Sequence, residues 1–293
     1  MSSKLTALTE SIVFSDSDQF YVVIDPGGAP LSRRIQSLTF QRYLPMPQSA
    51  ITGLALSNSI GDANNDITIA AGRALAGAGT YNLILSAAIT KQLDASWAVG
   101  TNQGGLDTGA KANSTWYHVF LIGRVDTHVV DVLFSTSATA PTMPANYTMK
   151  RRIGAIKTDS SGNILAFLQY GNQFRWTSIA SLDVDDATLT TVKKNYTLAG
   201  VPTGVIVNAA VNASVSHASV SVVAYVSNPN FTDYAPSATA VPLATLRSST
   251  TTSLPAKIRL LTDLSAQISA RSTNSNTTFK VAVLGWDDPL GCW

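Results

Sequence analysis

The sequence predicts an all-β protein, with a small N-terminal module followed by one or more antiparallel domains of the β-sandwich or jelly-roll kind. Short runs of apolar and β-branched residues recur about a dozen times, at intervals of roughly ten to fifteen residues, as in antiparallel sandwiches. Clusters of Gly, Asn, Asp and Ser separate these runs. Helical periodicity is nearly absent, and residues 182–192 form the best candidate for a longer helix.

Residues 1–46 are predicted to form a separate small module. An apolar strand at 20–24 precedes the turn sequence Asp25-Pro26-Gly27-Gly28, the chain resumes at Leu31, and residues 38–44 can form a short helix. So few large apolar groups cannot form a sufficient core alone. We therefore expect the module to pair with copies of itself or to dock on another protein.

The proline-containing segment 45–49 reads as a stiff linker, because prolines favour extended backbone. We expect residues 47–180 to form a central β-sandwich core. Residues 181–293 would either complete this sandwich or form a second β subdomain.

A hairpin at residues 115–136 is the expected centre of the fold. Its first run, 116–122, carries apolar or aromatic groups on both faces, and its second run, 129–134, is rich in β-branched residues. A strand that is apolar on both faces must be covered on both. The hairpin therefore belongs in the middle of a sandwich, or beneath another domain or subunit.

The remaining strands follow from local patterns. Alternation is clearest at 205–215, where Val and Ala alternate with more polar residues. Residues 97–106 read as a Gly-rich loop, and 150–157, 164–170 and 174–179 as a meander. Further strands are expected at 51–56, 67–71, 81–89, 221–226, 257–261, 266–270 and 279–284.

The amino-acid composition argues against nucleic acid as a partner, against membrane insertion and against an internal disulfide framework. Charged residues make up only 13% of the 293 residues and the net charge is +2, so nothing favours nucleic acid as a partner. No apolar run reaches the ~20 residues that cross a bilayer, and the N-terminus does not resemble a signal peptide, so we expect no membrane insertion. The single cysteine, Cys292, rules out an internal disulfide framework. Oligomerisation is then the expected source of durability.

No catalytic, cofactor-binding or metal-ligating residue is assigned, no cofactor is expected, and an enzyme is not predicted. The three histidines, His118, His128 and His217, lack the spacing of a metal site. Residues 62–66 begin like a calcium loop but lack its later glycine and glutamate, which favours a polar turn. The acids Asp183, Asp185 and Asp186 could serve glycoside hydrolysis, although neighbouring acids are usually solvated.

Aromatic residues in or beside loops could form a sugar-binding platform, because a flat ring stacks against a pyranose face. Packing in the core or at a subunit interface is the alternative for each of them. The candidates are Trp97, Tyr170, Phe174, Trp176, Tyr234 and Trp286.

Several segments resemble a family of phage and prophage virion proteins described as tail fibre or receptor-binding proteins. They are NDITIAAG (65–72), WAVGTNQGGLDTG (97–109), TWYHVFLIGR (115–124) and VDVLFSTSATAPTMPANYTMKRRIGAI (130–156). KLTALTE (4–10), FYVVIDPGG (20–28) and RRIQSLTF (33–40) resemble a module that opens many tail-fibre proteins and implies attachment to the virion. Residues 285–288, Gly-Trp-Asp-Asp, resemble the start of the family's C-terminal motif, whereas 289–293 depart from it.

The resemblance implies a homotrimer, made in the host cytoplasm and located on the virion. It would be a tail fibre that attaches to other tail or baseplate proteins by residues 1–46 and contacts a host-surface glycan through its β domain. A non-adhesive structural component, such as a capsid fibre, decoration protein or baseplate protein, is the main alternative. A polysaccharide depolymerase is a third reading, although the sequence lacks regular coil repeats.

Overall fold

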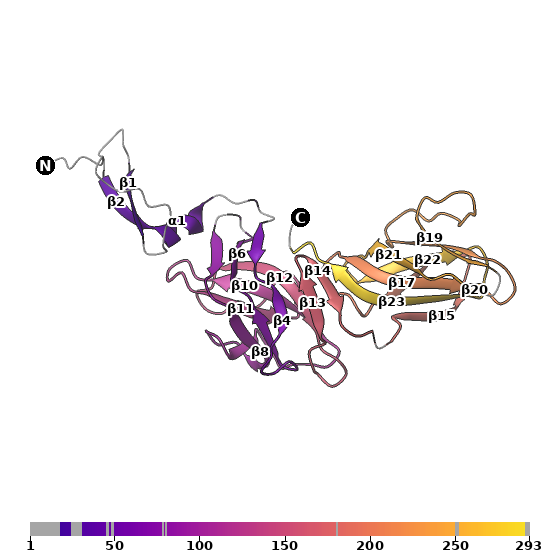
Figure 1. The fold of residues 1–293 in the computed structure, drawn as a ribbon, viewed down its shortest axis with the longest axis horizontal. Helices are drawn as coiled ribbons and strands as arrows, with labels where there is room; N and C mark the ends of the chain where they lie inside the picture. The colour runs from indigo at the N-terminus through magenta and orange to yellow at the C-terminus, as the bar shows by residue number, and fades with distance from the viewer. Residues whose placement is uncertain are drawn as a thin grey trace.

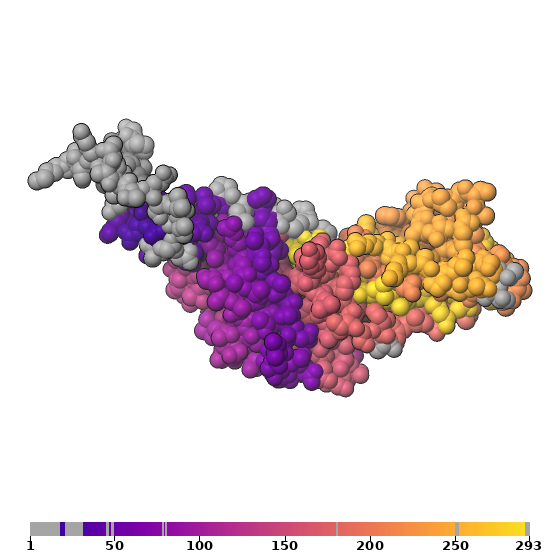
Figure 2. Space-filling model, viewed as in Figure 1, coloured from indigo at the N-terminus to yellow at the C-terminus, as the bar shows by residue number. Residues whose placement is uncertain are grey.

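The computed structural model describes residues 18–24, 31–44, 47, 50–77, 79, 81–179, 181–249 and 252–290. The described chain confirms the all-β prediction, since strands in several largely antiparallel sheets account for nearly all of its regular structure. Figure 1 shows a small N-terminal unit at one end, a first body in the middle and a second body at the other end. Figure 2 shows the same order of parts on the molecular surface.

The N-terminal unit consists of one hairpin and one short helix. Strands β1 (Gln19–Ile24) and β2 (Leu31–Gln36) pair antiparallel, and α1 (Ser37–Tyr43) follows directly. These elements confirm the predicted strands and helix, whereas the predicted turn at 25–28 lies outside the described residues. The Asn82 side-chain amide donates to the carbonyls of Gln41 (2.8 Å) and Leu44 (3.0 Å). A side chain of the first body thus satisfies carbonyls at the C-terminal end of α1.

The first body contains a seven-stranded sheet in the order β12-β10-β11-β9-β8-β5-β4 and a three-stranded sheet in the order β3-β6-β7. Its strands are β3 (Ile51–Gly53), β4 (Leu56–Asn58), β5 (Asp66–Ile69), β6 (Gly72–Leu75), β7 (Asn82–Leu85), β8 (Ile89–Ser96), β9 (Gln103–Leu106), β10 (Trp116–Gly123), β11 (Val130–Ser135) and β12 (Met149–Lys157).

The predicted central hairpin is confirmed as β10 paired with β11, with β12 on the other side of β10. Both faces of β10 are buried, also as predicted. Val119 and Leu121 belong to the main core, and Phe120 and Ile122 pack in a smaller cluster with Tyr147. The loop before β12 therefore helps to bury the second face of β10 within a single chain.

Several local predictions in the first body are wrong. The predicted strand 51–56 is divided into β3 and β4, because Leu54 has a positive φ of 59°. The segment 81–89 is divided between β7 and β8. The predicted loop 97–106 contains β9, which runs parallel to β8 and β11. Its glycines allow close approach, since a Cβ on Gly104 would lie 2.0 Å from the Ser96 carbonyl oxygen.

The second body is built from two further sheets. One has the order β13-β14-β23-β17-β21, with β15 also paired to β23, and the other has the order β16-β22-β18-β19-β20. The strands are β13 (Phe167–Tyr170), β14 (Gln173–Trp176), β15 (Val184–Leu189), β16 (Lys194–Thr197), β17 (Asn208–Ser216), β18 (Val223–Ser227), β19 (Ala244–Ser249), β20 (Thr252–Ser253), β21 (Ala256–Leu261), β22 (Gln267–Ser272) and β23 (Thr277–Asp287).

The predicted meander is confirmed only in part. Its last two strands form the antiparallel hairpin of β13 and β14, and the turn at 159–163 brings Thr158 and Ile164 into an antiparallel bridge. However, β12 otherwise pairs with β10, whereas β14 joins β23. Two strands that precede residue 180 are thus in one sheet with a strand from the end of the chain. The main core is likewise continuous, because Tyr117 of the first body and Trp286 of the second belong to the same buried cluster.

The alternation predicted at 205–215 is confirmed in β17, where Ala209, Val211, Ala213 and Val215 are buried. The helix considered for 182–192 is wrong. Residues 184–189 form β15, which pairs antiparallel with β23. Residues 182–192 contain three threonines and two valines but lack an apolar stripe at helical spacing, so pairing with a neighbouring strand decides the structure.

Candidate functional site

The structure does not bring the three histidines together. His118 is buried beneath Arg152, whose Nε donates to His118 Nδ1 at 2.9 Å. Burial, and secondarily the positive charge of Arg152, lowers the pKa of His118 to about 3. His128 Nδ1 lies 2.9 Å from the Tyr81 hydroxyl, and His217 contacts Ser219 in its own turn. Among the described residues no group of His, Cys, Asp or Glu could hold a metal ion.

The acidic candidates are engaged in local hydrogen bonds. Asp62 accepts from the backbone of Asn64 and Asn65 at 3.1 Å, which makes the calcium-like segment a polar turn. Asp186 pairs with Lys194 at 2.6 Å, and Asp185 lies 3.4 Å from Lys280.

The third acid, Asp183, has a different environment. Its carboxylate accepts from the backbone N–H groups of Gly200 (2.6 Å) and Val283 (3.2 Å). Asp183 therefore holds two backbone segments together, and it also lines the cleft described below.

Three of the aromatic candidates come together. Phe174 and Trp286 are fully buried and stack with their ring centroids 4.8 Å apart, and Trp176 lies 5.3 Å from Trp286. Trp116 of β10 completes the cluster at 5.3 Å from Trp286. For Phe174 and Trp286 the packing alternative is therefore correct, while Trp176 is only partly buried and also faces a cleft.

The other aromatic candidates lie apart from this cluster. Trp97 packs edge-on against Tyr147 and donates to the Val132 carbonyl at 3.1 Å, so it has a structural role in the first body. Tyr170 is 86% exposed in the β13–β14 hairpin, and Tyr234 is 48% exposed in the second body. These two are free to meet a ligand.

A cleft of about 460 Å³ lies where the first and second bodies meet. The first body contributes Lys157 and Asp159 among others, and the second body contributes Trp176, Asp183 and Gly200. Hydroxyl groups are frequent along it, namely those of Ser114, Thr158, Ser160, Thr177, Ser178 and Ser181. Its volume is in the range of small-molecule sites.

The polar groups of the cleft are preorganised. Trp176 Nε1 donates to the Gly200 carbonyl at 2.9 Å, which fixes the indole ring. Lys157 Nζ donates to the Ala199 carbonyl at 2.7 Å, and burial lowers the pKa of this amine despite the opposing charge of Asp183. An ammonium has three donors, so Lys157 retains others for a ligand.

The carboxyl group of Asp159 in the cleft is poorly suited to act as a general acid. Asp159 accepts from the backbone of Ser161 and Asn163, both at 2.8 Å, and these hydrogen bonds lower the pKa of its carboxyl. A carboxylate that is stabilised in its charged form is a poor general acid. The cleft offers a ligand one indole ring held by a hydrogen bond, several hydroxyls, one amine and two carboxylates.

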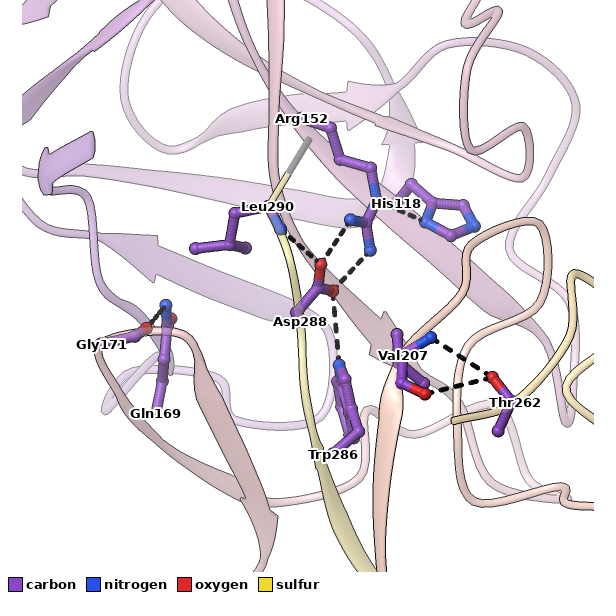
Figure 3. A network of polar contacts seen from close by, with 9 residues as sticks. All are labelled: His118, Arg152, Gln169, Gly171, Val207, Thr262, Trp286, Asp288 and Leu290. Carbon is purple, nitrogen blue, oxygen red and sulfur yellow. Dashed lines mark hydrogen bonds and ion pairs between the residues drawn. The ribbon is translucent and has the colours of Figure 1, made fainter. Parts of the chain in front are cut away.

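A buried polar network next to Trp286 ties the two bodies together (Figure 3). Arg152 of β12 donates through both terminal nitrogens to the two carboxylate oxygens of Asp288, each at 2.7 Å. Asp288 also accepts from Trp286 Nε1 at 3.3 Å and from the backbone N–H of Leu290 at 2.9 Å. Sequence reasoning missed this pair, although two adjacent arginines in a mainly apolar strand (RRIGAI) were a signal that a buried partner was needed.

No protein-family model matches the chain, and a search of curated proteins found no significant match. No helix among the described residues is long and apolar enough to cross a membrane.

Proposed function

We propose that this protein is a phage virion protein of the tail-fibre or receptor-binding kind. It attaches to the tail through its N-terminal module and contacts a host-surface glycan through its β bodies. The observation that carries the adhesive part is the cleft between the bodies, in which Trp176 is held by the Gly200 carbonyl among six hydroxyl-bearing residues. The resemblance of about residues 4–44 and 51–180 to such proteins supports the virion context.

The N-terminal unit supports a role in assembly. Its helix α1 leaves Phe40, Tyr43 and the following Leu44 exposed, although each is large and apolar. A unit of one hairpin and one seven-residue helix gains little stability from its own core. Contact with other copies, in a homotrimer, and with a tail or baseplate protein would cover these groups. Figure 1 shows this unit projecting from the end of the molecule opposite the second body.

The cleft supports carbohydrate rather than a charged or apolar ligand. A rigid indole face offers stacking to a pyranose ring without an entropic cost of ordering the side chain. Hydroxyls, Lys157 and Asp183 can exchange hydrogen bonds with sugar hydroxyls. Because one amine faces two carboxylates, we expect neutral or amino sugars to bind better than acidic ones. Weak binding per site would be amplified by several copies on one fibre.

The cleft is tested with the full chain on immobilised bacterial polysaccharides, namely lipopolysaccharide, capsular polysaccharide and wall teichoic acid. Ser178→Trp fills the cleft from its exposed rim, and Ser57→Trp places the same side chain on the exposed edge of β4 as a matched control. We expect the wild type and Ser57→Trp to bind one of these polymers and Ser178→Trp to lose most of that binding. Equal binding by all three proteins would reject the cleft as the glycan site.

Absence of binding to every polymer would favour a non-adhesive structural component of the virion. New reducing ends in the bound polysaccharide would instead favour a depolymerase. The hydrogen-bonded carboxylates of Asp159 and Asp183 argue against the latter outcome.

A further inference from the structure

The loop between β18 and β19, residues 228–243, is long and has no strand or helix of its own. Loops of more than roughly 12–15 residues without secondary structure are uncommon in compact domains and are usually functional or disordered. This one belongs to the second body, the part of the molecule furthest from the N-terminal unit (Figure 1). A fibre attached by its N-terminus would present the loop towards the host.

The first half of the loop is braced by two cationic side chains. Lys193 Nζ donates to the carbonyls of Pro229 (2.7 Å) and Phe231 (2.8 Å). Arg271 of β22 pairs with Asp233 at 2.9 Å. Asn228 begins the loop with a turn, because its side-chain oxygen accepts from the backbone N–H of Asn230 at 2.8 Å.

The second half is braced from below by the strands. The Tyr225 hydroxyl donates to the Ala240 carbonyl and accepts from the backbone N–H of Ser237 at 3.1 Å. Arg247 Nη2 donates to the Ala238 carbonyl at 3.0 Å. Asn228 also donates to the carbonyl of Leu261 in β21 at 3.3 Å, so the loop is held along its length rather than only at its ends.

This braced loop exposes two aromatic rings close in sequence to an ion pair. Phe231 is 49% exposed and Tyr234 is 48% exposed, and Asp233, which pairs with Arg271, lies between these two residues in sequence. Holding large rings in a fixed loop while leaving them half in water contributes little to folding. The same arrangement is favourable for recognition, because rigid aromatic anchors bind with a small loss of conformational entropy.

We propose that residues 231–234, with Arg271, form a second saccharide-contacting surface on each chain. Phe231 and Tyr234 would stack on sugar rings, and the exposed parts of Asp233 and Arg271 would bind sugar hydroxyls. This inference rests on the proposed adhesive function and deepens it, because each chain would then contact a polysaccharide at the cleft and at the loop. Two contacts on one polymer raise the effective affinity without any change at either site.

A second copy of the chain is the competing occupant, and the surface is poorly suited to it. Cores of stable protein interfaces are depleted of charged residues, whereas here the partly exposed ion pair of Asp233 and Arg271 belongs to the same loop surface. The two half-exposed rings are also a small apolar contribution compared with interfaces of roughly 1,200–2,000 Å².

The test uses the full chain and the same immobilised lipopolysaccharide, capsular polysaccharide and wall teichoic acid. Phe231→Ala and Tyr234→Ala remove the rings, and Leu168→Ala removes a large exposed side chain from β13, outside the loop and the cleft, as the control. Removal of one stacking ring weakens binding about threefold to tenfold. We expect this loss for both loop variants and wild-type binding for Leu168→Ala, with unchanged solution mass and melting temperature.

The outcomes separate this inference from the proposed function. If Ser178→Trp loses binding while both loop variants bind like the wild type, the loop surface is rejected and the cleft stands. If the loop variants lose binding only together with a fall in solution mass, the surface is an interface between copies and the inference is overturned. If the wild type binds none of the polymers, the inference and the adhesive function both fail.

Discussion

Arg152 and Asp288 are 136 positions apart in sequence and form a buried ion pair with two hydrogen bonds of 2.7 Å. Arg152 comes from β12 of the first body, and Asp288 follows β23 of the second. Two parallel charge-assisted hydrogen bonds fix both the distance and the orientation of the groups that they join. The pair therefore fastens the segment that follows β23 to the seven-stranded sheet of the first body.

Breaking this pair from one side should destabilise the fold strongly. Arg152→Leu leaves the Asp288 carboxylate buried without its cation, and such losses cost about 3–5 kcal/mol. Asp288→Asn in the same protein removes the stranded charge, so the double variant should be more stable than the sum of the single effects predicts. Urea denaturation of the four proteins measures the coupling. Additive free energies would show that the two groups do not depend on each other.

The buried His118 should make stability depend on pH. Its pKa is about 3 in the folded chain, against an ordinary value of about 6.5 when unfolded. Below pH 6.5 the unfolded chain therefore binds a proton that the folded chain does not, and stability falls as the pH falls towards 3. One such proton contributes about 1.4 kcal/mol per pH unit.

A comparison of wild type with His118→Leu isolates this contribution. Between about pH 6 and 5, where carboxyl groups with ordinary or lowered pKa values change little, the wild type should lose roughly 1 kcal/mol more than the variant. His128, whose pKa is also lowered by burial, contributes with the same sign to both proteins. Equal losses in urea denaturation at the two pH values would contradict the buried, neutral imidazole.

Gly285 should tolerate no side chain. Its φ is +143°, and a Cβ there would lie 2.1 Å from the Phe174 carbonyl oxygen, where β14 meets β23. We expect Gly285→Ala to cost about 3 kcal/mol or more, because backbone rather than a flexible side chain must move. Gly61→Ala is the control, since the nearest atom to its Cβ would be Ser59 Oγ at 3.9 Å. Similar melting temperatures for both variants would show that β14 and β23 are not packed this closely.

Asn82 should hold the N-terminal helix to the first body. Asn82→Ala removes both hydrogen bonds to the end of α1, for which we expect a local loss of about 1–2 kcal/mol. Hydrogen exchange should then quicken at residues 37–43 by about tenfold, with little change in β10. Asn195→Ala, at an exposed position of β16, is the control. Unchanged exchange in α1 would mean that other contacts hold the helix.

The sequence alone predicted those strands whose burial follows from the spacing of apolar residues along the chain. The alternation now seen in β17 and the two apolar faces of β10 are properties of consecutive residues, so the sequence alone indicated both strands and their burial. Such local patterns do not indicate which strands pair with each other. The pairing of β14 with β23 joins Phe174 to Trp286, and nothing near either residue specifies the other.

The same limit applies to the candidate site. Trp176 could be nominated as a loop aromatic, but its cleft needs Lys157 and Asp183, which come from separate strands or loops. Phe174 and Trp286 carried the same sequence signal and are buried, because their neighbours in space rather than in sequence cover them. The acids at 183–186 looked alike in sequence and diverge in the structure, each to a different partner.

The proposed fibre requires several chains to assemble through the N-terminal module, and light scattering measures this assembly. The solution mass of the full chain is compared with that of a chain lacking residues 1–46. We predict three times the chain mass for the full protein and a monomer after truncation. A stable monomer in both cases would contradict the fibre, and would favour a virion component that meets its neighbours only on the particle.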